Sequence, residues 1–150
     1  MRHAIDLARR NVRESNGGPF ASLVVRNGEI LARGTNLVTS MNDPTAHAEV
    51  VAIRNACAAL RQFQLSGCDI YATCEPCPMC LGAIFWARPA KIFYASTKQD
   101  AAAAGFDDSL IYEQLALAPE TRRIPMLQIL REEGQAAFQE WKTKPDKIEY

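Results

Sequence analysis

Two short motifs constrain the fold of this 150-residue chain more than any other feature. The first is T-A-H-A-E, which contains His47 and Glu49, and the second is C-E-P-C-P-M-C, which contains Cys77 and Cys80. One imidazole and two thiolates in Cys-x-x-Cys spacing suit a zinc ion, and three such ligands leave the fourth tetrahedral position open, as in catalytic zinc sites. We therefore expect a fold that brings the two motifs together around one zinc ion.

Each motif is expected at the start of a helix. We place His47 in the first turn of one helix, and Cys77 and Cys80 on one face at the start of another. The partial positive charge of a helix N-terminus favours a thiolate over a thiol. Glu49 lies two residues after His47, and such positions do not share a helix face. We therefore expect the Glu49 carboxylate to point into a pocket beside the metal and to move protons rather than bind the ion.

The cysteines also allow other interpretations. Cys74, Cys77 and Cys80 could join Cys68 in a closed zinc site of four cysteines, or in an iron–sulfur site. Against the iron–sulfur site, the fourth cysteine of a bacterial-type run is absent after Cys80. A cluster that binds no metal is the remaining alternative. Cys57 falls on a buried helical stripe and is expected in the core.

Charge and composition limit the class of substrate and the compartment. Acidic and basic side chains both number 17, so the formal net charge is zero, whereas nucleic-acid binders usually carry a basic surplus. We therefore expect a small neutral substrate and no nucleic-acid partner. No apolar run approaches the length of a membrane span, and the first residues are too charged for a secretory signal, so we expect no membrane association. Five cysteines in such a chain favour metal ligation in the cytoplasm over disulfides.

The hydrophobic pattern predicts one α/β domain over residues 1–150, with a mixed sheet flanked by helices. Asn27-Gly28 predicts the turn of a β-hairpin, and Asp43 and Pro44 predict the N-cap and first residue of a helix. The apolar stripes of the first two helices are expected at Ala4, Ile5, Ala8 and Val12, and at Ala46, Val50, Ile53, Cys57 and Leu60. The expected helices cover 4–14, 44–60, 76 or 78 to about 86, 100–104 and 135–141, and the expected strands 21–26, 29–33, 68–73, 92–95 and, weakly, 126–130.

The motif N-D-P-T-A-H-A-E at 42–49, with the cysteine run, resembles the cytidine deaminase-like superfamily of zinc deaminases, whose nucleobase members carry H-x-E and P-C-x-x-C. Further along, A-G-F-D-D-S at 104–109 and a tail ending in Tyr150 are similar to the small bacterial guanine deaminases. This resemblance implies a three-layer α/β/α fold and a homodimer that exchanges its C-terminal segments, about 130–150. The first helix is slightly short beside the family, which leaves open whether Met1 is the natural start.

The resemblance also implies roles for single residues. The implied zinc ligands are His47, Cys77 and Cys80, and the implied proton shuttle is Glu49. Asp108, favoured over Asp107, matches a residue that reads the base and helps to move protons, and Tyr150 matches a residue that closes the pocket. The remaining implied substrate contacts are Phe20, Asn36 and the backbone of Ala48. Trp86, at the end of a helix, is expected in the core or, alternatively, at the substrate pocket.

The implied reaction is the hydrolysis of guanine to xanthine and ammonia. Zinc lowers the pKa of bound water and so supplies hydroxide for attack on C2 of the base, while Glu49 carries protons to the ring nitrogen and the departing amine. The N–H groups of guanine suit a carboxylate such as Asp108, which adenine would leave poorly paired. The alternatives are another aminopurine or guanosine deaminase, a tRNA adenosine deaminase, which would need a basic RNA-binding face, and a structural metal-binding module.

Overall fold

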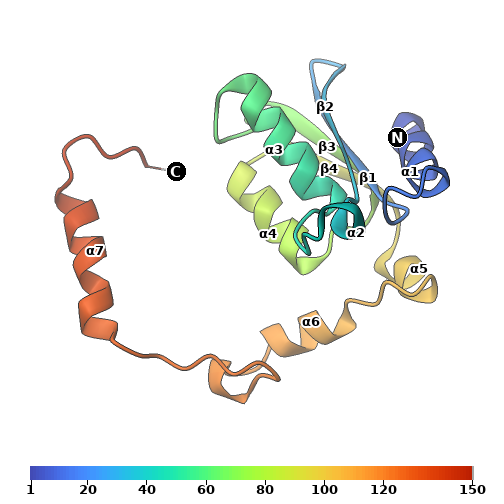
Figure 1. The fold of residues 1–150 in the computed structure, drawn as a ribbon. Coiled ribbons are helices and arrows are strands. Elements are labelled where there is room, and N and C mark those ends of the chain that lie inside the picture. Colours follow the sequence, from blue (N-terminus) through green and yellow to red (C-terminus); the bar gives the residue numbers. More distant parts are fainter. Residues whose placement is uncertain (150) are drawn as a thin grey trace. The chain divides into compact units, whose positions relative to one another are not determined.

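The computed structural model describes residues 1–149, and the chain divides into two compact units. The first unit is Met1–Asp108, and the second begins at Ser109. Each unit has its own secondary structure (Figure 1). The sequence predicts a single domain over residues 1–150, and this stays a prediction. The predicted mixed sheet and the helices that flank it all lie in the first unit.

The first unit is built on a four-stranded sheet in the order β2–β1–β3–β4. The strands are β1 (Ala21–Arg26), β2 (Glu29–Thr35), β3 (Cys68–Cys74) and β4 (Lys91–Ser96). Strand β1 pairs antiparallel with β2 and β3, whereas β3 and β4 run parallel. Between β1 and β2, Asn27 and Gly28 both adopt positive φ, as a type I′ turn requires. The predicted hairpin and mixed sheet are confirmed.

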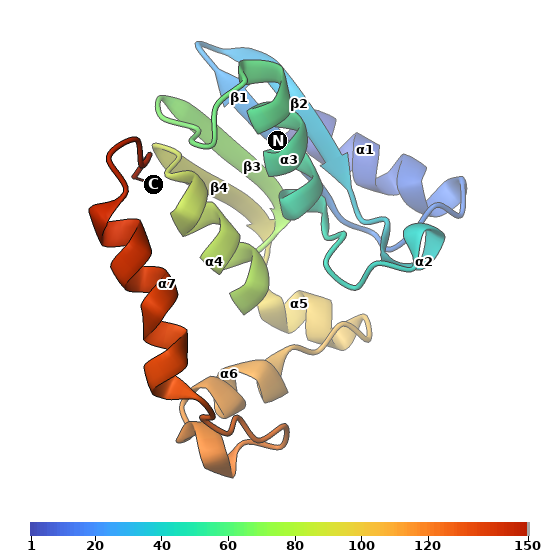
Figure 2. The ribbon, with the colours of Figure 1, turned by 60° about the vertical axis from the view of Figure 1, so that its left-hand side comes forward.

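Helices cover both faces of this sheet, which gives the expected three layers. Helix α1 lies on one face, and α3 and α4 lie side by side on the other (Figure 2). The helices of this unit are α1 (Arg2–Arg13), α2 (Val38–Met41), α3 (Ala48–Leu60), α4 (Pro78–Ala87) and α5 (Lys98–Ala103). Thr97 and Asp100 form a capping box that starts α5. The fold class predicted from the sequence is confirmed.

Helix α3 lies close against the sheet because small residues meet at the contact. Ala48, Ala52 and Ala56 are fully buried, and Gly34 of β2 lies beneath the first two of them. A Cβ atom on Gly34 would lie 2.2 Å from the Ala48 carbonyl oxygen and 2.4 Å from the Ala52 nitrogen. The buried face of α3 is therefore offset from the predicted stripe. Ile53 and its neighbours on that stripe are only partly buried at the edge of the core.

The predicted start of α3 at Asp43 and Pro44 is wrong. The helix begins at Ala48, and His47 occupies the N-cap position. The Asp43 carboxylate instead accepts hydrogen bonds from the backbone nitrogen and the hydroxyl of Thr45, at 2.8 and 2.7 Å. Such a bond closes a local turn, which competes with helix initiation for the same side chain. His47 thus stands at the helix boundary rather than inside the first turn.

Helix α1 is confirmed, but its inward face differs from the expected one. Ala4 and Ala8 are buried as predicted, whereas Val12 is 49% exposed and Asn11 is buried in its place. An amide is tolerated at a buried position only when it is hydrogen-bonded. Asn11 meets this condition through two bonds to backbone carbonyls.

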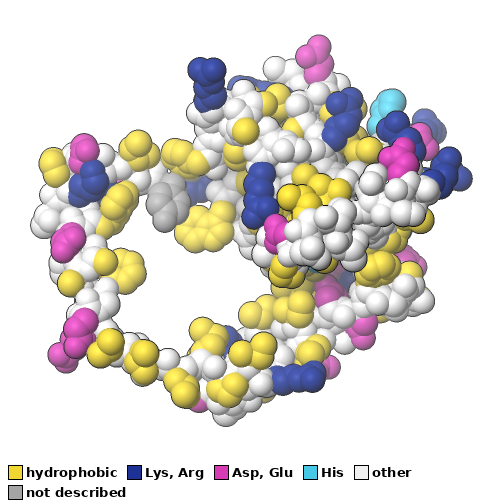
Figure 3. Space-filling model, viewed as in Figure 1, with side chains coloured by type: hydrophobic (Ala, Val, Ile, Leu, Met, Phe, Trp, Pro, Cys, Tyr) yellow, Lys and Arg dark blue, Asp and Glu magenta, His cyan; other side chains and the backbone are white. Residues whose placement is uncertain are grey.

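The second unit is helical and builds no core of its own. It contains α6 (Ser109–Leu115), a 3₁₀ turn (Pro119–Thr121) and α7 (Arg131–Thr143), and none of its described residues is buried. Figure 3 shows hydrophobic side chains spread along its surface. The predicted helix 135–141 is confirmed and begins earlier. The weak strand 126–130 is wrong, because that segment has no strand partner among residues 1–149 and a strand needs one.

Among residues 1–149, no helix combines the length and the apolar character that a membrane span needs.

Replacing Gly34 with alanine should destabilise the first unit and displace the start of α3. The added methyl group would meet backbone atoms, which cannot rotate away, and overpacking of this kind costs about 1–3 kcal/mol. Gly82→Ala is the matched control, because Gly82 lies inside α4 with open space around its Cβ position and alanine favours a helix by about 1 kcal/mol. Thermal unfolding measures both variants. An unchanged melting temperature for Gly34→Ala would contradict the close contact.

Candidate metal centre

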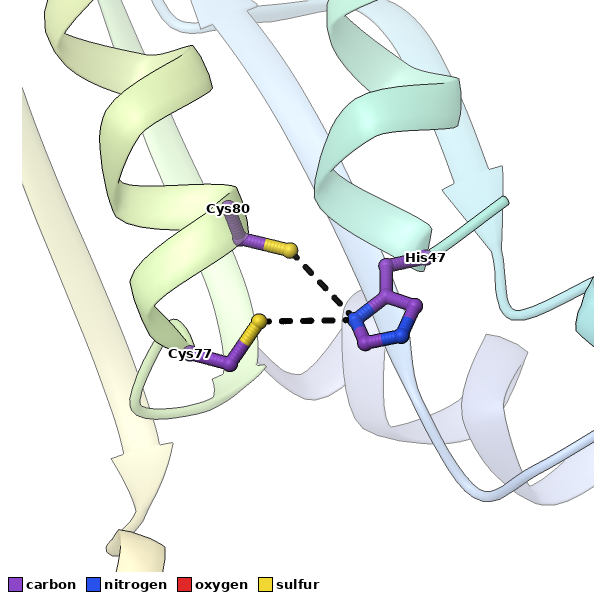
Figure 4. Close-up of side chains that lie close together, drawn as sticks. All are labelled: His47, Cys77 and Cys80. Atoms are coloured by element: carbon purple, nitrogen blue, oxygen red, sulfur yellow. Dashed lines mark hydrogen bonds between the residues drawn. The ribbon is translucent and has the colours of Figure 1, made fainter. Parts of the chain in front are cut away.

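Three metal-ligating side chains meet where two helices begin. His47 and Cys77 occupy the N-cap positions of α3 and α4, and Cys80 follows in the first turn of α4. The Nδ1 atom of His47 lies 3.6 Å from the sulfur of Cys77 and 3.5 Å from that of Cys80 (Figure 4). All three ligand atoms lie within 4.8 Å of one another. The structure thus brings together the ligand set expected from the two motifs.

The spacing of these atoms fits a zinc ion. Zinc binds sulfur at about 2.3 Å and imidazole nitrogen at about 2.0–2.1 Å in tetrahedral geometry, which places a sulfur and a nitrogen ligand about 3.6 Å apart. The two observed sulfur–nitrogen separations, 3.6 and 3.5 Å, agree with this value. Among residues 1–149, these three are the group of histidine, cysteine and acidic side chains placed to hold a metal. Three protein ligands leave one tetrahedral position for a water molecule or a substrate.

The local electrostatics favour a thiolate before any metal binds. The neighbouring Cys80 side chain, together with the His47 ring, holds the pKa of Cys77 down at about 4. In turn, the hydrogen bond with Cys77 raises the pKa of His47. The N-terminus of α4 contributes in the same direction, because its partial positive charge stabilises an anion at the cap. Cys77 is therefore prepared as an anionic ligand.

Glu49 lies beside the ligand set and outside it. The residue is in the first turn of α3, is only 7% exposed, and accepts a hydrogen bond from the Cys80 thiol at 3.4 Å. Burial raises its pKa. A buried carboxyl next to an open metal position can hold and release a proton near neutral pH, which is what a general acid and base must do.

The other two cysteines of the second motif region do not belong to this centre. The Cys74 thiol donates a hydrogen bond to the carbonyl of Thr97 at 3.4 Å, and burial raises its pKa to about 11. Cys68 is fully buried in the hydrophobic core. Both thus pack in or beside β3, and the closed site of four cysteines is not formed. Cys57 packs at the edge of the same core.

Residues expected to contact a base lie beside the ends of strands or at the start of a helix. Asn36 directly follows β2 and is buried, and its side-chain oxygen accepts from the backbone nitrogens of Gly18 and Val38. Phe20 directly precedes β1 and is half-buried. Ala48 is the first residue of α3, so its amide is one of those that no helical carbonyl satisfies. These groups are the hydrogen-bond donors and apolar surface that a flat heterocycle would need.

The two residues of the acidic pair after α5 differ in burial. Asp108 is half-buried, and its pKa is raised by this burial and by the nearby Cys77. Asp107 is exposed. Phe106, two residues earlier, packs edge-on against Phe20 with ring centres 4.9 Å apart. This aromatic contact ties the segment that carries Asp108 to the loop that precedes β1.

One predicted site residue is not brought to the centre. Trp86 lies in the last turn of α4 and is 66% exposed, whereas Cys80 lies in the first turn of the same helix. The expectation that Trp86 packs in the core is wrong, and its alternative role at a pocket stays a prediction. Tyr150 lies outside the described residues.

Sequence reasoning missed several residues that shape the site. Asn11 bonds to the carbonyls of Gly18 and Asn36, and nothing in the apolar pattern of α1 signals it. Glu75 accepts from the backbone nitrogen of Lys98 at 3.2 Å and so links the cysteine loop to the start of α5. Gly34 had a readable signal, because a glycine inside a strand often marks a close approach of two backbones.

Comparison with known proteins gives a family and several relatives. The sequence signature described as the cytidine and deoxycytidylate deaminase zinc-binding region matches residues 1–96. Guanine deaminase from Bacillus subtilis (strain 168) is 51% identical over 150 residues, which is 100% of this chain and 96% of that protein. The X-ray structure of guanine deaminase from Bacillus subtilis superimposes with a TM-score of 0.97, at 51% identity over 99% of this chain and 95% of that one.

Two further relatives match a smaller part of the chain. A tRNA-specific adenosine deaminase from Agrobacterium fabrum (strain C58) is 41% identical over 97 residues, which is 63% of this chain and 64% of that protein. A crystal structure of a mutant of the protein NE0047 in complex with 8-azaguanine has a TM-score of 0.68 at 36% identity. That match covers 71% of this chain and 62% of the other.

The zinc-compatible ligand set, the three-layer fold and the match over residues 1–96 define a zinc-dependent deaminase. The chain belongs to the family of the cytidine and deoxycytidylate deaminase zinc-binding region.

Cys77→Ala should abolish zinc binding, because it removes the ligand whose lowered pKa favours the thiolate and leaves only two protein ligands. Cys74→Ala is the control, since Cys74 lies in the same motif but bonds to a backbone carbonyl. Metal analysis of the purified proteins should give one zinc per chain for the wild type and for Cys74→Ala. Full zinc in Cys77→Ala, or its loss in Cys74→Ala, would overturn the ligand assignment.

Proposed function

We propose that this protein is a guanine deaminase that hydrolyses guanine to xanthine and ammonia with one zinc ion per chain. One observation carries the proposal: the 51% identity to a guanine deaminase extends over all 150 residues. The family signature ends at residue 96, and tRNA-specific adenosine deaminases from Agrobacterium fabrum and Bacillus subtilis match 97 and 114 residues. The full-length likeness therefore includes the segment with Asp108, which a generic deaminase signature does not require.

The chemistry divides between the metal and the protein. Zinc held by three protein ligands activates water as a nucleophile near pH 7. Glu49 would accept one proton from that water and deliver it to the ring nitrogen next to the reacting carbon. It would then take the proton of the added hydroxyl group and deliver it to the departing amine, which leaves as ammonia. Its burial and its position beside Cys80 suit this task, because the raised pKa brings proton uptake and release closer to neutral pH.

The base is read by four groups around the metal. The NH₂ of Asn36 and the amide of Ala48 donate hydrogen bonds to the base, and Phe20 packs on its ring. The Asp108 carboxylate accepts from guanine N–H and helps to move protons. Adenine does not present the same N–H pattern, so it would leave a partly buried carboxylate without its partner, at a cost of about 1–3 kcal/mol.

The protein acts as a homodimer with exchanged C-terminal segments. Within the first unit, β4 is an edge strand whose Phe93 and Tyr94 side chains are exposed, although parallel strands are normally covered on both faces. The second unit carries exposed apolar residues such as Ile124 and Leu127 without a core. Exchange of identical segments between subunits is a low-cost way to cover both surfaces. In this arrangement Tyr150 closes the pocket of the partner subunit, and Trp86 lines the same pocket.

The compartment proposed for this enzyme is the cytoplasm. All five cysteines are free thiols in the structure, and the metal centre needs two of them reduced. Reducing conditions of this kind prevail in the cytosol.

The function is tested by measuring ammonia release from guanine, guanosine, adenine, adenosine, cytidine and a tRNA anticodon stem-loop. Guanine should give the highest kcat/KM. Glu49→Gln should keep its zinc and its fold and lose at least about two orders of magnitude in kcat, since a general acid and base contributes about 10²–10⁴-fold. Preference for another substrate would refute the guanine assignment. Retained turnover in zinc-replete Glu49→Gln would refute the proton shuttle.

Asp108→Ala should lower kcat/KM for guanine by roughly ten- to a hundredfold, because a charged hydrogen-bond partner is worth about 1.5–3 kcal/mol. Zinc content should not change, since Asp108 is outside the ligand set. Asp107→Ala is the control and should have a milder effect, as the residue is exposed. Equal and small effects of the two substitutions would show that the pair is only a surface turn.

Deleting Glu149 and Tyr150 should sharply reduce kcat while zinc content and helical signal persist. Mixing this truncated protein with Glu49→Gln subunits then tests the exchange. If the tail reaches across, a mixed dimer contains one site with both an intact Glu49 and an intact tail, and activity returns. Light scattering and a tag on one subunit confirm that mixing has occurred. No recovery in proven mixed dimers would rule out the exchange.

A further inference from the structure

We propose that Asn11 is a positioning residue for the base-binding side of the site, acting through Asn36 and the turn that leads to Phe20. The inference rests on the proposed function in one respect, since it assumes that Asn36 contacts the substrate. Asn11 lies on α1, which carries none of the residues of the metal centre.

The place of Asn11 in α1 is unusual for a polar side chain. It is 3% exposed and follows Ala4 and Ala8 along the inward face of the helix. A buried amide lowers stability unless hydrogen bonds replace the water that it loses. Its presence on an otherwise apolar face therefore indicates a specific bonding role.

Both hydrogens of the Asn11 amide have a partner. The Nδ2 atom donates to the carbonyl oxygen of Gly18 and to the carbonyl oxygen of Asn36, each at 2.9 Å. Because both partners are acceptors, the orientation of the amide follows from them. One side chain thus joins α1 to two loops, seven and 25 residues away in the chain.

The two loops are joined to each other at the same point. The Gly18 nitrogen donates to Oδ1 of Asn36 at 3.3 Å, and the Asn36 nitrogen donates to the carbonyl of Phe20 at 3.1 Å. Asn11, Gly18 and Asn36 therefore form a closed ring of hydrogen bonds. Since backbone amides engage the Asn36 oxygen, its NH₂ is the group that the proposed function assigns to the base.

Close packing makes this ring stiff. A Cβ atom on Gly17 would lie 2.1 Å from the carbonyl oxygen of Asn36 and 3.2 Å from its Oδ1. The turn at 17–18 is thus pressed directly onto Asn36. If the bonds from Asn11 are lost, the carbonyl oxygen of Asn36 loses its side-chain donor and that of Gly18 keeps only the bond from the Phe20 nitrogen. Any shift of the turn then moves Asn36 with it.

Asn11→Ala and Asn11→Asp test the proposal, and Ser22→Ala is the control. Ser22 is equally buried and near Phe20, but its hydroxyl has no hydrogen-bond partner in the part of the chain that the structure describes. With the base that the wild type deaminates best, we expect both Asn11 variants to raise KM about tenfold or more, with kcat within threefold and one zinc per chain. Ser22→Ala should leave KM unchanged.

A purely structural role gives a different result. A weakened fold reduces the fraction of active enzyme, which lowers apparent kcat and the melting temperature but leaves KM unchanged. That result, or the failure of both Asn11 variants to fold, would overturn the proposal. Failure of the wild type to deaminate guanine would count against the proposed function instead, because the Asn11 measurement uses whichever base is turned over.

The pair Asn11 and Asn36 is tested directly by a double-mutant cycle. If Asn11 acts through Asn36, then Asn11→Ala should not raise KM further in an Asn36→Ala protein. Independent, multiplicative effects of the two substitutions on KM would contradict action through Asn36.

Discussion

The metal centre depends on two helix N-termini that point at one place. The N-terminal ends of α3 and α4 carry partial positive charge, and His47 and Cys77 stand at their N-cap positions. Two such ends would repel each other without negative charge between them. The Cys77 thiolate supplies this charge, and the neighbouring Cys80 and His47 side chains hold its pKa low. The anionic ligand and the arrangement of the two helices therefore stabilise each other, and a neutral side chain at position 77 would disturb both.

Close backbone contact positions both sides of the site. On the metal side, α3 is positioned by backbone contact with β2 at Gly34, which leaves little freedom along the sheet. On the other side, the 17–18 turn lies equally close to Asn36 at Gly17, and hydrogen bonds, among them those from Asn11, hold the two segments together. The second side therefore depends on buried polar groups in addition to close packing.

Much of the fold and of the metal centre could be predicted because the signals are local. Asn27 and Gly28 suit the two positive φ angles of a hairpin turn, whatever the rest of the chain does. A Cys-x-x-Cys pair brings its two sulfur atoms together at the start of a single helix. The failures have a different origin. Asp43 caps a turn instead of a helix because Thr45 offers it two donors. Asn11 faces inward because it donates hydrogen bonds to the carbonyls of two loops. Those loops lie outside α1, so the apolar pattern of the helix could not indicate them.

The boundary between the two compact units follows Asp108. All three metal-ligating residues and Glu49 lie before it, and Asp108 is the last residue on that side. The chain is thus modular in an evolutionary sense. The part up to residue 96 carries the three metal-ligating residues and Glu49, and it matches the family signature. Changes in the chain after residue 96 leave these four residues in place, so that end of the gene can vary without rebuilding the metal centre.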